Sequence, residues 1–178
     1  MRSLRVKLAI VVAVIGAVVI TAAAVAGNRP KLGTALRGYE EVPAISTTGH
    51  GTFEARISKS SQEIPFTLTY DDLEGAVTQS HIHFGQKSVN GGIVVWLCQT
   101  GQAAAPAGTA VCPAPPATVT GVITPAHVVA QTPNQGIEAG AFDELVNALR
   151  ARVAYANVHS TKWPGGEIRG QLGKRRHR

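Results

Sequence analysis

The chain has 178 residues, a formal net charge of +6 and 44% hydrophobic residues, with the hydrophobic residues concentrated at the N-terminus. Three basic residues lie in the first seven positions and four in the last five. Residues 28–172 therefore carry 10 basic and 11 acidic side chains. This nearly neutral body excludes the basic face of a nucleic-acid-binding protein. Its length suits one domain with a hydrophobic core.

Residues 1–26 have the pattern of a signal peptide. A basic start is followed by an uncharged run over residues 8–26, which ends in the small residues Ala24, Val25 and Ala26 before Gly27. This run is also long enough to span a bilayer, so a retained membrane anchor through residues 8–26 is the alternative. Either way, we expect the rest of the chain to be secreted, or anchored with the domain outside the cytoplasm. The basic tail, residues 173–178, is expected to be solvated and flexible.

Short segments of β character follow one another between turn residues. They cover residues 34–36, 52–57, 66–70, 77–84, 93–98, 119–123, 153–159 and 168–172. Asn90-Gly91-Gly92 predicts a turn that folds the fourth segment back on the fifth. Short strands at this spacing predict an all-β sandwich or barrel made of a single domain.

The chain has two cysteines, Cys98 and Cys112, separated by a segment rich in Ala, Gly and Pro. In an exported chain such a pair predicts a disulfide. A bridge that closes a loop of this size contributes roughly 3 kcal/mol in the chain-entropy description. A redox or metal-binding pair would be expected to have closer spacing.

One segment, residues 141–152, has helical periodicity. Phe142, Leu145, Val146 and Leu149 recur on one face, with acidic residues near the start and basic residues near the end. We expect this helix to cover an open edge or end of the sandwich.

The most informative side chains are histidines. His81 and His83 are two residues apart in a predicted strand, so they project from the same face. His159 lies on another predicted strand, and the three imidazoles would suit zinc or copper if those strands are neighbours. Glu167 is then a candidate fourth ligand or a hydrogen-bond partner of a ring N–H.

A structural role is the alternative for these histidines. The imidazoles could instead bond to Asn157, Ser160, Glu167 or backbone groups and so fix the register of the strands. Glu167 and Arg169 alternate along one strand and could form a buried pair. No motif for a catalytic nucleophile or a phosphate loop is present.

A series of short motifs resembles the CHRD domain, a module named after chordin and found alone in exported bacterial proteins. The motifs are Leu36-x-Gly38-x-Glu40-Glu41-Val42-Pro43, Leu73-x-Gly75, His81-Ile82-His83-x-Gly85, Tyr155-x-Asn157-Val158-His159-Ser160 and Pro164-x-Gly166-Glu167-Ile168-Arg169-Gly170-Gln171-Leu172. They span residues 32–172. The chain departs from the pattern at Arg152, where a glycine is common.

The resemblance implies an immunoglobulin-like, Greek-key β-sandwich with distant similarity to copper-zinc superoxide dismutases. It implies a structural part for the motif residues Asn157, Arg169 and Gln171. It also implies binding or scaffolding of an extracellular protein or polymer, with no catalytic residue. The alternative is a zinc- or copper-binding module that uses the three histidines, and dismutase-like chemistry would be its extreme form. A two-metal dismutase site, however, needs a longer set of ligands than this chain offers.

Overall fold

The computed structural model describes residues 31–173, apart from residues 59, 61 and 102–104. The predicted leader, residues 1–26, and residues 174–178 of the predicted tail lie outside the described residues. Within the described part of the chain, no helix has the length and apolar character needed to cross a membrane.

Eight strands form the framework of the described chain, and each corresponds to a predicted segment. They are β1 (Lys31–Arg37), β2 (His50–Arg56), β3 (Ile64–Asp71), β4 (Val77–Phe84), β5 (Gly92–Gln99), β6 (Ala117–Ile123), β7 (Ala154–Ser160) and β8 (Ile168–Gln171). Two short 3-10 turns, η1 (Gly38–Glu40) and η2 (Pro125–His127), and one helix, α1 (Phe142–Ala151), complete the fold. The predicted all-β class is confirmed.

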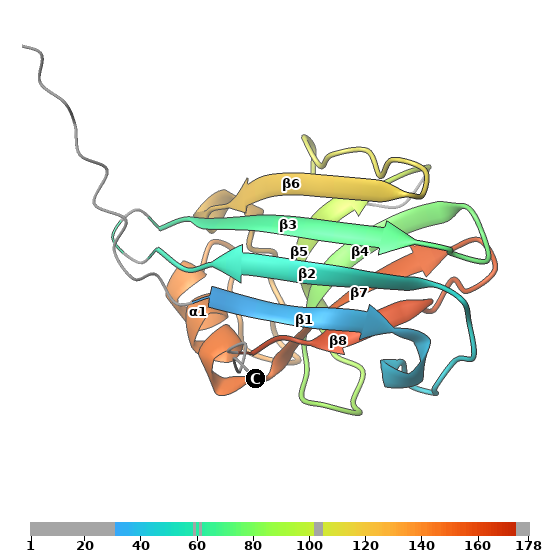
Figure 1. The fold of residues 1–178 in the computed structure, drawn as a ribbon. Helices are drawn as coiled ribbons and strands as arrows, with labels where there is room; N and C mark the ends of the chain where they lie inside the picture. The colour runs from blue at the N-terminus through green and yellow to red at the C-terminus, as the bar shows by residue number, and fades with distance from the viewer. Residues whose placement is uncertain (1–30, 59, 61, 102–104, 174–178) are drawn as a thin grey trace, which may run out of the picture.

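All strands join one antiparallel sheet in the order β5-β4-β7-β8-β1-β2-β3-β6. The sheet bends over at β8 and β1, which meet through Arg37 and Arg169. As a result β1, β2, β3 and β6 form one layer, and β5, β4, β7 and β8 form the other behind it (Figure 1). The predicted hairpin is present, because β4 pairs with β5 across residues 85–91. Its turn lies at Lys87 and Ser88, before the predicted Asn90-Gly91-Gly92, and Gly92 already belongs to β5. The sheet is thus nearly closed, with β5 and β6 as its two edges.

The hydrophobic core fills the space between the layers. Ile82 of β4 and Val158 of β7 meet Leu68 and Phe53 of the opposite layer within one buried cluster. Helix α1 lies across one end of the layers (Figure 1). Its four apolar side chains, Phe142, Leu145, Val146 and Leu149, are all buried in the same cluster. The predicted helix is therefore confirmed, and it closes an end of the sandwich.

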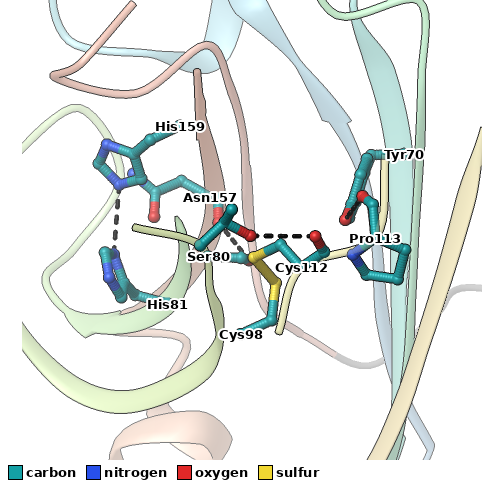
Figure 2. The surroundings of a disulfide bond; sticks show 9 residues. Tyr70, Ser80, His81, Cys98, Cys112, Pro113, Asn157 and His159 are labelled. Atoms are coloured by element: carbon teal, nitrogen blue, oxygen red, sulfur yellow. Dashed lines mark hydrogen bonds between the residues drawn. A yellow bond between two sulfur atoms is a disulfide. The ribbon is translucent and has the colours of Figure 1, made fainter. Parts of the chain in front are cut away.

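The Cys98–Cys112 disulfide lies where the two edges of the sheet approach each other. It joins β5 to the segment that leads into β6, and both cysteines are buried in the core cluster. Just beyond it, the Tyr70 hydroxyl on β3 donates to the Pro113 carbonyl at 2.6 Å (Figure 2). The predicted disulfide is thus present, and it fastens one layer to the other at the seam.

The residue that caps the C-terminal end of α1 has a strained backbone conformation that can be tested by mutation. Arg152 caps the helix with φ 61° and ψ 33°, a left-handed conformation that glycine adopts without steric cost. We expect Arg152→Gly to raise the free energy of unfolding by about 1 kcal/mol in urea titrations. Arg152→Ala is the control, since alanine keeps the Cβ. An equal gain from both variants would show that the backbone strain is not the cause.

Candidate metal centre

The pairing of β4 with β7 sets the position of the histidines. His81 lies opposite Asn157, His83 opposite Tyr155, and Gln79 opposite His159. Residues that pair directly in an antiparallel sheet project from the same face. The intervening residues of these strands belong to the core. The histidines therefore form a polar row on the face of the sheet that is turned away from the core.

The three predicted ligands converge. Nδ1 of His81 lies 3.2 Å from Nε2 of His159 (Figure 2). One nitrogen from each of His81, His83 and His159 lies within 4.8 Å of the others. Two nitrogens bound to one tetrahedral zinc ion are roughly 3.3 Å apart, given bonds of about 2.0 Å. The His81–His159 pair already has this spacing, so a modest shift of the His83 ring would complete the set.

All three rings are buried, although they lie outside the core. The exposed fractions are 0% for His81, 8% for His83 and 6% for His159. Trp96 of β5 covers His81 edge-on, with ring centroids 4.3 Å apart. The β4–β5 and β7–β8 loops supply the backbone groups that contact His83 and His159. A strand face that would otherwise meet solvent is thus enclosed by one tryptophan and two loops.

Backbone carbonyls orient two of the rings. Nδ1 of His83 donates to the Gly91 carbonyl at 2.8 Å, and Nδ1 of His159 donates to the Pro164 carbonyl at 2.9 Å. A carbonyl oxygen only accepts, so each of these nitrogens carries the hydrogen. Nε2 of His159 is left with a lone pair that faces His81. This is the arrangement by which proteins orient a histidine ligand toward a metal ion.

His83 and His81 have unmet hydrogen-bonding capacity. Nε2 of His83 lies 3.1 Å from Oδ1 of Asn157, and a neutral imidazole has one hydrogen for these two oxygens. When His81 donates from Nδ1 to His159, its Nε2 is buried and has no partner among the described residues. Leaving such a group unpartnered costs about 1–3 kcal/mol.

Burial keeps the three histidines neutral. Burial, together with the smaller effects of the neighbouring His159 and His83, lowers the pKa of His81 to about 2. Burial lowers the pKa of His83 to about 4, against the bond to Gly91. Burial also lowers the pKa of His159. Neutral imidazole is the form that binds a metal ion, so no proton has to be displaced near pH 7.

Tyr155 of β7 stacks on His83, and Arg169 of β8 stacks on Tyr155. The His83 ring lies parallel to Tyr155 at 4.7 Å, and Cζ of Arg169 lies 3.3 Å from the centre of the Tyr155 ring. Arg169 donates to Asn90 at 3.0 Å and to the Val89 carbonyl at 2.7 Å. The β4–β5 loop, whose Gly91 orients His83, is thereby fastened to β8.

Glu41 is a second buried acid in this region that the sequence did not single out as a site residue. It is 7% exposed, and burial raises its pKa to about 7 against the opposing charge of Arg169. A Cβ at Gly166 would lie 2.5 Å from Oε1 of Glu41 and 3.0 Å from Nδ2 of Asn157. Glu41 therefore packs against the β7–β8 loop close to Asn157, whose side chain contacts His83.

Glu167 does not join the cluster. Its Oε1 accepts from the Thr47 hydroxyl and from the backbone N–H of Glu74, each at 2.7 Å. It ties the β1–β2, β3–β4 and β7–β8 loops together, and the three-residue group does not include it. Glu167 does not pair with Arg169 either, because Arg169 instead donates to the β4–β5 loop. The regular alternation assumed for residues 167–169 starts only at Ile168, where β8 begins.

The other motif residues have structural roles. Gln171 donates to the carbonyls of Gly85 and Arg152, each at 2.9 Å, and joins β8 to the β4–β5 loop and to the end of α1. His50 and His127 are exposed and lie outside the cluster. Trp96 was missed at the sequence level, although the predicted β4–β5 hairpin already placed it near His81.

The fold and the site define an all-β domain with a buried cluster of three histidines on an outer sheet face. Residues 32–172 match the CHRD domain, and the chain belongs to this family. No curated protein and no solved structure matches the chain.

The pKa shifts predict that stability falls in acid. Each buried histidine has a folded-state pKa below the ordinary 6.5, so the unfolded chain takes up protons first as the pH falls. Each contributes up to about 1.4 kcal/mol per pH unit below about pH 6.5. Glu41 acts in the opposite direction between about pH 7 and its ordinary value of 4.5.

We therefore expect urea titrations to show a constant free energy of unfolding above about pH 7 and a steep loss from pH 6.5 to 4.5. Glu41→Gln removes the opposing contribution, so this variant should lose stability more steeply, by up to about 1.4 kcal/mol per pH unit. Equal stability at pH 7 and pH 5 in the wild type would contradict the neutral, buried state of the histidines.

The β7–β8 loop offers a matched pair of glycine variants. Gly166 has φ 126°, and a Cβ there would meet Glu41 and Asn157. A Cβ at Gly165 would meet nothing within 4 Å. We expect Gly166→Ala to cost about 1–3 kcal/mol in chemical denaturation, and Gly165→Ala to cost much less. Similar costs for the two variants would mean that the loop does not depend on the contact with Glu41.

Proposed function

We propose that this CHRD domain binds one transition metal ion, zinc or copper, through His81, His83 and His159. The observation that carries the proposal is the convergence of three buried, neutral imidazoles within 4.8 Å. Imidazole suits both metals, and the carbonyls of Gly91 and Pro164 supply the outer hydrogen bonds typical of histidine ligands.

The unpartnered Nε2 of His81 strengthens the metal proposal. A cluster built only to fix strand register would satisfy its buried nitrogens. Here rotation of the His81 ring would offer either nitrogen to an ion, while the other two rings are held by their Nδ1 hydrogens. Membership of the CHRD family suggests a binding module, and this proposal names a transition metal ion as its ligand. We propose binding without catalysis.

We also propose that the domain works outside the cytoplasm, secreted or anchored through residues 8–26. The buried Cys98–Cys112 disulfide supports this location, because disulfides persist in oxidising compartments. The links β3–β4 and β6–β7 pass from one layer to the other, as Greek-key connections do. This arrangement supports the immunoglobulin-like or dismutase-like subtype of the sandwich.

A binding role for an extracellular protein or polymer is the second candidate. A shallow groove of about 370 Å³ crosses the outer face of β2, β3 and β6, in the layer opposite the histidines. Its polar lining includes His50, Thr52, Thr69, Asp71 and Thr118. These hydroxyl, imidazole and carboxylate groups can hydrogen-bond to a ligand, while apolar atoms make up the larger part of the groove's surface. The groove is independent of the metal site, so both functions can be tested in one protein.

Elemental analysis and titration test the metal proposal. We expect the purified full-length protein to bind one equivalent of zinc or copper, and His81→Ala plus His83→Ala to lose it. Copper should quench the fluorescence of Trp96, whose ring lies 4.3 Å from that of His81. Trp96→Phe should abolish most of the quenching and keep the stoichiometry.

The control variant is His50→Ala plus His127→Ala, which removes two exposed histidines outside the cluster. We expect it to bind as the wild type does. Near-ultraviolet circular dichroism would check that each variant is folded. Substoichiometric binding by the folded wild type, or equal binding by the two double variants, would reject the proposed site.

A further inference from the structure

We propose that the three-histidine site selects monovalent copper, Cu(I), over the divalent ions Zn(II) and Cu(II). This inference rests on the proposed metal-binding function and names its ligand. It follows from the charges around the cluster and from its burial.

The site offers no negative charge to a metal ion. The candidate group contains only His81, His83 and His159, and a neutral imidazole contributes no charge. Both cysteines are used in the disulfide, and the sole methionine of the chain is Met1. Glu167 lies outside this group: its Oε1 accepts from the Thr47 hydroxyl and the Glu74 N–H, while its buried Oε2 has no partner among the described residues. A bound ion would therefore keep its full charge.

The surroundings of His83 are already positive. The Arg169 guanidinium lies 3.3 Å from the Tyr155 ring centre, and Tyr155 stacks on His83 at 4.7 Å. The charge of Arg169 is among the factors that lower the pKa of His83. Glu41 offsets this charge only in part, because burial raises its pKa to about 7. Any added positive charge is thus opposed here.

The cost of burying an ion rises with the square of its charge in the Born description. A divalent ion would pay about four times the self-energy of a monovalent ion of the same size in this enclosure, whose rings are at most 8% exposed. The three imidazoles attract an ion through their lone pairs but, unlike a carboxylate or thiolate, do not neutralise its charge. The lower cost of burying a single charge therefore favours Cu(I).

Coordination number points in the same direction. Zinc takes four ligands, and three-histidine zinc sites leave the fourth position open to water. The three rings here are covered by Trp96 and by the loops that carry Gly91 and Pro164. Cu(I) is stable with three ligands.

Competition titrations on the folded, purified full-length protein test this selectivity. Cu(I) would be supplied under argon with ascorbate and the chromophoric chelator bicinchoninate, and Zn(II) and Cu(II) with chelators of known affinity. We expect Cu(I) to bind at least about a hundredfold more tightly than Zn(II), and at least tenfold more tightly than Cu(II). A tenfold ratio between the copper ions equals a rise of about 59 mV in the reduction potential of the bound copper.

Three outcomes are distinguishable. Cu(I) binding that exceeds Zn(II) and Cu(II) binding by these ratios, and that His159→Gln weakens while the exposed-histidine control His127→Ala keeps it, would support the inference. Zn(II) or Cu(II) binding as tight as Cu(I) would overturn the selectivity and leave the metal-binding function standing. Failure of all three ions to bind stoichiometrically would overturn both. The wild-type comparison decides the selectivity even if a histidine variant does not fold.

Discussion

The pairing of β4 with β7 is the constraint on which the site depends. Its register sets His81 beside Asn157 and His83 beside Tyr155, and it turns Ile82 and Val158 toward the core. A slip of one residue would exchange these two sets, burying imidazoles in the hydrophobic core and exposing apolar side chains. The same hydrophobic burial that stabilises the sandwich therefore holds the histidines in one row on its outer face.

A row of buried polar side chains has to be enclosed and satisfied to be tolerated. The Gly91 and Pro164 carbonyls orient two rings, and Arg169 fastens the loop that carries Gly91. These contacts do not satisfy every ring nitrogen, because Nε2 of His81 has no partner among the described residues. Because unpartnered buried groups are costly, the arrangement suits a cation that joins the three rings. The proposed selectivity for Cu(I) rests on the neutrality of these rings.

Local patterns in the sequence were sufficient to predict the fold elements. Short segments of β character between turn residues predicted the eight strands, the periodic stripe from Phe142 to Leu149 predicted the helix, and the two cysteines predicted the disulfide. The suggested pair of Glu167 with Arg169 is not formed, because it assumed regular alternation in a segment where the strand has not yet begun. Glu41 was not recognised as part of the site, since its contact with the β7–β8 loop joins residues far apart in the chain.

The sequence by itself determined the all-β class, the face shared by His81 and His83, and the family, because alternation and motif order are local properties of the chain. The tertiary structure decided that His159 joins them, since that depends on β7 lying beside β4 although 69 residues separate the two strands. It also decided the state of the three rings. Burial and carbonyl bonds fix their charge and orientation, and both arise only when loops from distant parts of the chain close over the sheet.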